Sequence, residues 1–285
     1  MKEIAAAALL AGAVFGVSAA EKDPRWYLTV DNDVVFHTDR WYTSGVNISR
    51  VAPAGDHEME WSLIQEIYTP EGKRFEPGTV DRAPIGRLLL SGARHDMDAL
   101  RFQTIQVALG VRGRAALGRR TTEVVHHVVP SPFVDWDRED ATHFDALVAG
   151  VRSHSYGPVV IHYGGVAGNS RTFAHAGAQV GFGPTLHSPL LRYAPTPPPA
   201  AGTGGWSGFA GVGGRAVILD KLVERSYDAA LAPPSRERFV GRFAAGVGSV
   251  YSWGSVSFAI AMDTPEFEGQ RIGHRFGSLM LHVDF

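Results

Sequence analysis

The chain has 285 residues and a formal net charge of −2, and it contains no cysteine. Because the charges nearly balance, the chain has no excess of Lys and Arg with which to bind a polyanion. This excludes a nucleic-acid-binding protein of the histone type. Without thiols there are no disulfides, no thiolate nucleophile and no Cys-ligated metal. Stability must therefore come from packing, from backbone pairing or from a membrane.

The N-terminal segment has the features of a secretory signal. Lys2 gives a charged start, Ile4–Val17 is an apolar and small-residue core, and Ser18-Ala19-Ala20 offers a cleavage site. We therefore expect export, with residues 1–20 as signal peptide and residues 21–285 as one mature domain. After residue 20, no segment approaches the run of about 20 apolar residues that a membrane-spanning helix needs.

Alternation with a period of two marks the C-terminal part of the chain. Ser255–Met262 reads SVSFAIAM and Ser278–Phe285 reads SLMLHVDF, so large apolar residues alternate with small or polar ones. This period is typical of strands. In a soluble barrel or sandwich the apolar set would face inward, whereas in a membrane barrel it faces lipid. The terminal Phe285 resembles the C-terminal signature of outer-membrane barrels and favours the membrane barrel.

Similar segments recur from one end of the mature chain to the other. They predict strands at Arg25–Asp31, Thr43–Val51, Glu60–Tyr68, Arg87–Gly92, Thr104–Val111, Phe144–Arg152, Pro158–Gly165, Phe173–Gly183, Trp206–Leu219, Arg238–Gly246, Ser249–Met262 and His274–Phe285. An even number of strands suits a bacterial membrane barrel, and closure leaves no unpaired edge in lipid. The expected fold class is all-β: a twelve-stranded antiparallel transmembrane β-barrel. Proline-rich Ala194–Gly205 predicts a loop, and Ala115–Val129 predicts a short helix in the loop after the fifth strand.

A first polar cluster lies where the first predicted strand ends. Asp31, Asn32, Asp33 and Asp39 place three carboxylates and an amide within nine residues, and such hard oxygen ligands are those that Ca²⁺ prefers. A hairpin loop without a ligand is the alternative, because the same residues form ordinary turns. Strict alternation turns Asp31 and Asp33 inward and Asn32 outward. A bulge or twist at the strand end is then needed to bring Asn32 to a shared site.

Two further clusters lie in predicted loops. His126-His127 falls in the predicted helix, and histidine is the usual general base near neutral pH, although loop histidines also occur without a catalytic role. Lys73-Arg74 and Arg82 follow the third predicted strand. These cations are suited to phosphates through charge-assisted hydrogen bonds, and the alternative is that they are solvated loop charges.

Short motifs recur in a specific order and spacing along nearly all of the mature chain. They are Asn32-Asp33, Asp39–Gly45 (DRWYTSG), Ile67–Gly72 (IYTPEG), Asp81-Arg82, Leu117-Gly118 followed by His126, Trp136, Gly164–Asn169, Phe209–Val212 and Glu266-Phe267. Together they resemble the lipid A 3′-O-deacylases, the LpxR-type family of outer-membrane enzymes. The resemblance implies a twelve-stranded barrel and a Ca²⁺-dependent activity that removes the 3′-linked acyloxyacyl group of lipid A.

The same resemblance implies roles for individual residues. We infer that His126 activates water for attack on the ester carbonyl, that Asp33 helps to hold Ca²⁺, and that Asn32 and Thr43 position the ion, the water or the ester. The cations Lys73, Arg74 and Arg82 would orient the substrate through its phosphates. This division of labour is similar to that of secreted phospholipases A2. The expected partners are lipid A or lipopolysaccharide and the surrounding outer-membrane lipids, and a monomer is expected.

The sequence departs from the family pattern at a few places. Ala83–Gly86 follows Asp81-Arg82 where Pro-Tyr-Ala-Gly-like residues are common, and Thr122 stands where a glutamine is expected four residues before the active histidine. These changes bear on substrate orientation more than on ester chemistry. Two alternatives stay open: an outer-membrane phospholipase with the same His and calcium chemistry, and an inactive structural or adhesive barrel. A porin is not expected, because about twelve strands leave a lumen that side chains fill.

Overall fold

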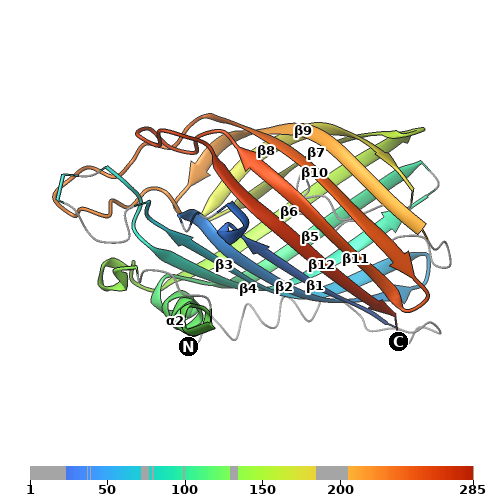
Figure 1. The fold of residues 1–285 in the computed structure, drawn as a ribbon, viewed down its shortest axis with the longest axis horizontal. Helices are drawn as coiled ribbons and strands as arrows, with labels where there is room; N and C mark the ends of the chain where they lie inside the picture. The colour runs from blue at the N-terminus through green and yellow to red at the C-terminus, as the bar shows by residue number, and fades with distance from the viewer. Residues whose placement is uncertain are drawn as a thin grey trace.

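The computed structural model describes residues 24–36, 38, 40–71, 77–78, 80–98, 100–128, 134–183 and 205–284. Within these ranges twelve antiparallel strands form a closed barrel in which β12 pairs with β1 (Figure 1). They are β1 (Arg25–Asn32), β2 (Trp41–Ala54), β3 (His57–Thr69), β4 (Ile85–Met97), β5 (Arg101–Arg112), β6 (His143–Tyr156), β7 (Val159–Gly168), β8 (Arg171–Phe182), β9 (Gly205–Asp220), β10 (Phe239–Tyr251), β11 (Gly254–Asp263) and β12 (His274–Asp284). The predicted fold class is confirmed. The signal segment, Phe285 and the proline-rich stretch up to residue 204 lie outside the described residues.

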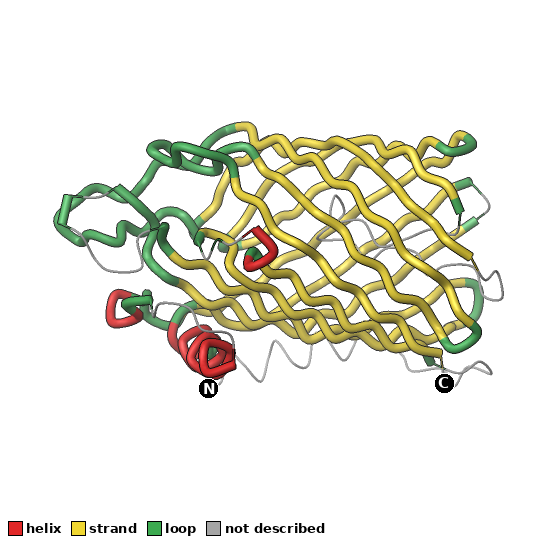
Figure 2. Tube along the Cα trace, in the orientation of Figure 1, coloured by secondary structure: helices red, strands yellow, loops and turns green. Residues whose placement is uncertain are grey.

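The two ends of the barrel differ in their connections (Figure 2). At one end, here called the turn end, β1 begins and β12 ends, and short turns such as Gly55-Asp56 join β2 to β3, β6 to β7 and β10 to β11. The much longer connection from β8 to β9, which contains the proline-rich stretch, belongs to the same end, and most of it lies outside the described residues. The other end, the loop end, carries η1 (Val34–Phe36), η2 (Arg114–Ala116), α2 (Gly118–Val128) and η3 (Trp136–Arg138). The helix predicted over Ala115–Val129 is thus confirmed as α2, with η2 before it. Among the described residues, no helix has the length and apolar character to cross a membrane.

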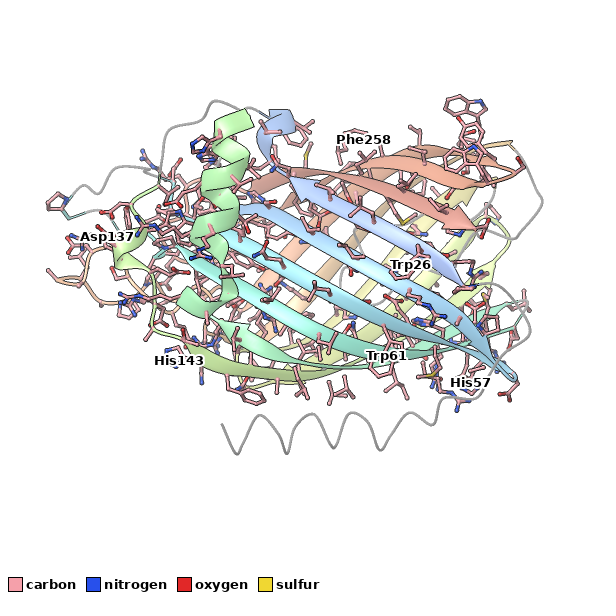
Figure 3. The ribbon with its side chains drawn as sticks, turned by 90° about the horizontal axis from the view of Figure 1, so that it is seen from below. Trp26, His57, Trp61, Asp137, His143 and Phe258 are labelled. Carbon is pink, nitrogen blue, oxygen red and sulfur yellow. The ribbon has the colours of Figure 1, made fainter. Side chains whose placement is uncertain are left out.

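The exposed fractions of the side chains follow the predicted alternation. On β12, Leu279 is 49% exposed, whereas Ser278 and Met280 are 2% and 5% exposed. Large apolar side chains stay exposed all around the wall, among them Trp26, Ile48, Leu63, Leu90, Ile105, Val148, Val180, Val212, Phe243 and Phe258 (Figure 3). Such a broad apolar surface is expected to face lipid rather than water. The soluble barrel is therefore excluded.

Most predicted strands differ from the observed ones by a few residues at one or both ends, and the largest differences are at β4 and at the turn between β10 and β11. β4 continues to Met97 because its polar His95 belongs to the inward face, where its ring nitrogens hydrogen bond to Thr104 (2.9 Å) and Glu60 (3.0 Å). The predicted strand Ser249–Met262 is divided between β10 and β11. β11 begins at Gly254, whose φ of +147° is rarely adopted by residues with a Cβ.

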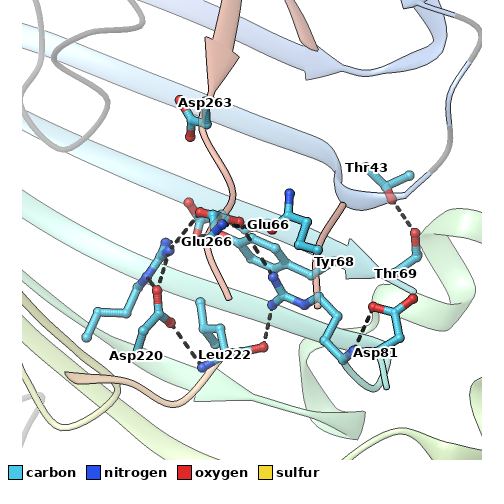
Figure 4. A network of polar contacts seen from close by, with 12 residues as sticks. Thr43, Glu66, Tyr68, Thr69, Asp81, Asp220, Leu222, Asp263 and Glu266 are labelled. Carbon is cyan, nitrogen blue, oxygen red and sulfur yellow. Dashed lines mark hydrogen bonds and ion pairs between the residues drawn. The ribbon is translucent and has the colours of Figure 1, made fainter. Parts of the chain in front are cut away.

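Buried ion pairs occupy the lumen near the loop end (Figure 4). Arg87 donates to Asp145 (2.7 Å) and to Glu66 (3.2 Å). Arg171 of β8 donates to Asp220 (2.7 Å) and, across the barrel, to the hydroxyl of Tyr68 on β3 (3.0 Å). Buried charges persist only when they are paired and hydrogen-bonded. At this level the interior is a packed polar layer, as the small number of strands predicts.

Candidate functional site

A cleft lies on the outer side of the barrel wall at the loop end, between the β1–β2 loop and α2. It is lined by Asn32, Asp33, Val34, Thr38, Thr43, Ser44, Ile67, Thr121, Thr122, Val125 and His126, and its free volume is about 80 Å³. Helix α2 lies across the outer face of the strands (Figure 3). The space accommodates a small reacting group with a water molecule, whereas acyl chains must remain outside it.

The end of β1 supplies Asn32 and Asp33. β1 keeps its register with both neighbours up to Asn32, and the chain then leaves the sheet into η1. The Oδ1 atom of Asn32 accepts a hydrogen bond from the Val34 amide (2.7 Å). Asp33 is 1% exposed, and its Oδ2 atom accepts from the Arg40 amide (2.8 Å) and the Thr38 hydroxyl (3.1 Å). Of the predicted bulge or twist at the end of β1, no bulge occurs, and both residues reach the cleft where the chain turns out of the sheet into η1.

A bulge occurs instead in β2. Tyr42 pairs with Tyr68 of β3 and Ser44 pairs with Ile67 of β3, so Thr43 is an extra residue of β2 that has no partner residue on β3. A bulge turns two consecutive residues towards one side, and Thr43 and Ser44 both line the cleft. The Thr43 hydroxyl hydrogen bonds to the hydroxyl of Thr69 (2.5 Å), which fixes its rotamer.

Helix α2 supplies the histidine. Thr122 and His126 are one helical turn apart and share a face, and both line the cleft. His127 is exposed, and its Nδ1 atom lies 2.6 Å from the carbonyl oxygen of Glu123 within the same helix. The structure thus separates the two adjacent histidines, and it brings His126 to Asn32, Asp33 and Thr43.

The helix is seated by close backbone contact and by a small apolar core. A Cβ built on Gly118 would lie 3.0 Å from the Cα of Gly86 and 2.9 Å from the indole of Trp136. Trp136 packs with Ile67 and Val134 beneath the loop. Trp136, which the motif analysis singled out, is therefore part of the packing that holds α2.

Of the three predicted phosphate-binding residues, the structure describes Arg82, and it lies away from the cleft. Arg82 is fully buried, its guanidinium lies 4.4 Å from the ring centre of Tyr68, and it donates to the carbonyl of Leu222. Arg82 is therefore not a cleft residue, and it instead packs among buried residues under the loops. Lys73 and Arg74 fall outside the described residues.

Apolar side chains flank the cleft, a feature that the polar motifs did not reveal. Val34 and Val35 of η1 are 47% and 48% exposed, and Val124 and Val125 of α2 are 68% and 41% exposed. The sequence did not predict this feature, because each pair of valines lies in a segment whose other residues are mostly polar. Together with the apolar wall below, they make the surroundings of the cleft suitable for lipid chains.

The cleft oxygens fit calcium by type. Asn32 offers an amide oxygen, Asp33 a carboxylate, and Thr38, Thr43 and Ser44 hydroxyls, all of which are hard ligands. Asp33 is the one carboxylate among the described lining residues, and the described part of the chain holds no group of three or more His, Cys, Asp and Glu suited to a metal. Because affinity follows the number of charged ligands, such a set predicts weak binding.

Comparisons with known proteins agree with the fold. The family model described as outer membrane protein LpxR matches residues 4–285. The structure of LpxR from Salmonella typhimurium aligns with a TM-score of 0.76 at 18% identity, covering 92% of this chain and 100% of that one. BamA from Haemophilus ducreyi lacking POTRA domains 1-3 aligns with a TM-score of 0.36 at 9% identity, covering 92% and 71% of the two chains. Among curated proteins, none matches the sequence.

Proposed function

Because the chain belongs to the LpxR family of outer membrane proteins, we propose that it is a lipid A deacylase that hydrolyses the 3′-linked acyloxyacyl ester. One observation carries the proposal: Asn32, Asp33, Thr43 and His126, supplied by β1 with its following loop, by β2 and by α2, line one small cleft on the outer wall. A histidine beside hard oxygen ligands is suited to water-mediated ester hydrolysis.

His126 would act as the general base. Its half-buried imidazole takes a proton from a water molecule in the cleft, and that water attacks the ester carbonyl. When the carbon–oxygen bond breaks, the imidazolium returns the proton to the leaving sugar oxygen, so a free acid and an alcohol result. His127, with its Nδ1 atom against the carbonyl of Glu123, would take no part.

Asn32 and Asp33 would hold calcium, with hydroxyls such as that of Thr43 beside them. When bound, Ca²⁺ would polarise the ester carbonyl and offset the charge that develops on its oxygen. The hydrogen bond between the Thr43 and Thr69 hydroxyls holds the Thr43 hydroxyl in the cleft. With Thr69 as the donor in this pair, the Thr43 hydrogen would be available to a developing oxyanion, and a donor held in place needs little reorganisation during the reaction.

The outer-wall position explains how a lipid would reach this chemistry. The exposed valines of η1 and α2 lie beside the polar cleft, so acyl chains can stay among apolar neighbours while the ester enters. Lys73 and Arg74 would bind the phosphates of the headgroup, which would place one particular ester at His126.

Mass spectrometry of lipid A from cells that express the chain tests the proposal. We expect loss of the acyloxyacyl mass with the parent protein, no loss with His126→Ala, and parental behaviour with the matched control His127→Ala. Chelation of calcium should abolish the parental reaction. Unchanged lipid A with hydrolysed glycerophospholipid would instead indicate the phospholipase, and no change in either lipid would indicate an inactive barrel.

A further inference from the structure

We propose that Gln65 is a positioning residue that clamps α2 to the barrel wall and thereby sets the place of the His126 imidazole. Gln65 lies on β3, and its side chain alternates with the lumen-facing Glu66 and so lies on the outer face. The proposal rests on the proposed function, because the position of His126 matters only if His126 reacts.

The contacts of Gln65 reach both sides of the helix start. Its Nε2 atom donates to the carbonyl oxygen of Ala116 (2.8 Å), and its Oε1 atom accepts from the hydroxyl of Thr121 (3.0 Å). Ala116 ends η2, and Thr121 lies in the first turn of α2. A side-chain amide both donates and accepts from one planar group, so one residue fixes two points of the loop against the wall.

These two points control rotation as well as distance. Thr121 and Thr122 lie one turn before Val125 and His126, and all four line the cleft. The glycine contact between Gly86 and Gly118 sets how near the helix lies to the wall, but it contains no side chain that resists rotation. The bonds from Thr122 to Gly118 and from His127 to Glu123 stay within the helix. The exposed ion pair of Arg119 with Asp137 ties the helix to η3, which is part of the loops and not of the barrel wall. The Gln65 amide therefore links the rotation of α2 directly to a strand of the barrel.

A small rotation at Thr121 displaces the imidazole one turn further on. A misplacement of about 1 Å in a reacting group costs about 100-fold in rate. The barrel should be insensitive to the same change, since its strands are held by pairing with their neighbours on both sides. The inference thus predicts a kinetic loss without a loss of barrel stability.

The test compares Gln65→Leu with the parent, and Gln103→Leu serves as matched control. Gln103 is also an outward glutamine in a hydrogen bond, to Arg152 at the turn end. We expect Gln65→Leu to lower kcat on lipid A about 10- to 100-fold with little change in KM, and to leave the heat-unfolding temperature of the barrel unchanged. Thr121→Val, which removes one of the two bonds, should give a smaller loss, and Thr121→Ser should restore the parental rate.

A second readout does not depend on activity. The chain has no cysteine, so Arg120→Cys on the exposed side of α2 takes a single nitroxide label. The label should become more mobile in Gln65→Leu and stay ordered in Gln103→Leu. An ordered label, an unchanged kcat or a lowered unfolding temperature in Gln65→Leu would each overturn the positioning role. If the parent leaves lipid A intact, the proposed function fails, and label mobility alone then decides whether the clamp exists.

Discussion

Replacing Asp33 by asparagine separates two roles that one carboxylate has in the structure. Its Oδ2 atom holds the β1–β2 loop through the Arg40 amide and the Thr38 hydroxyl, and its charge is proposed to hold calcium. In Asp33→Asn the amide oxygen can still accept both hydrogen bonds. The change from charged to neutral acceptor costs about 1–2 kcal/mol, which the paired strands of the barrel tolerate. The negative charge is lost, and the calcium concentration for half-maximal activity should rise at least about tenfold, or about 1.4 kcal/mol.

The assay is the rate of lipid A deacylation, followed by mass spectrometry across a calcium titration. High calcium should restore most of the rate in Asp33→Asn. It should not do so in Asp33→Ala, because that variant leaves the Arg40 amide without its side-chain acceptor in a partly buried turn and removes one of the two acceptors of the Thr38 hydroxyl. The loop that carries Asn32 should then become disordered. A half-maximal calcium concentration in Asp33→Asn equal to that of the parent would show that Asp33 is a structural turn residue only.

Three further outcomes follow from the structure. His126→Ala should lower kcat about 100- to 10,000-fold while His127→Ala stays near the parent in the same assay, and equal losses in both would remove the base assignment. Arg87→Gln leaves Asp145 and Glu66 buried without their shared cation. The free energy of unfolding, measured by denaturant titration of the detergent-solubilised barrel, should therefore fall by about 3–5 kcal/mol. An unchanged denaturant midpoint would mean that water reaches these groups. Burial raises the pKa of Asp81 to about 6. The folded state then binds the extra proton between about pH 4 and 6, and stability should fall by about 3 kcal/mol as pH rises through this window. Asp81→Asn should flatten that pH profile of unfolding, and an identical profile would contradict the buried assignment.

The barrel could be predicted from the sequence because membrane strands obey a local rule. Each outward residue meets lipid and each inward residue meets other polar groups. Apolar residues therefore alternate with small or polar ones in segments such as Ser255–Met262. The rule fails where a polar residue continues an inward face, as at His95, whose partners Glu60 and Thr104 come from two other strands. The rule also fails at tight turns between similar segments. Between β10 and β11 the two-residue turn contains an aromatic residue, so the sequence gives no clear mark of where one strand ends and the next begins.

The site was predictable in its members and less so in its geometry. Asn32, Asp33, Thr43 and His126 were expected together and are found together. A bulge or twist was expected at the end of β1, whereas the bulge that turns Thr43 to the cleft lies in β2. Its position depends on how β2 pairs with β3, which a single segment does not encode. Arg82 looked like a loop cation, yet it is covered by Leu222 and Tyr68, which are distant in sequence. Gln65 carried no signal, since an isolated outward glutamine on a strand predicts no partner.

The filled lumen and the outward cleft are two consequences of one barrel size. Twelve strands enclose an interior that Arg87, Arg171 and their carboxylate partners occupy at the loop end, so a bulky lipid has no room there. Chemistry on a lipid must then use the outer wall, where a bare strand surface offers only apolar side chains. A loop helix laid against that wall supplies what the strands lack: it brings a histidine to polar groups at two strand ends while its valines stay in apolar surroundings. The proposed reaction would therefore depend on how firmly α2 is held to the wall.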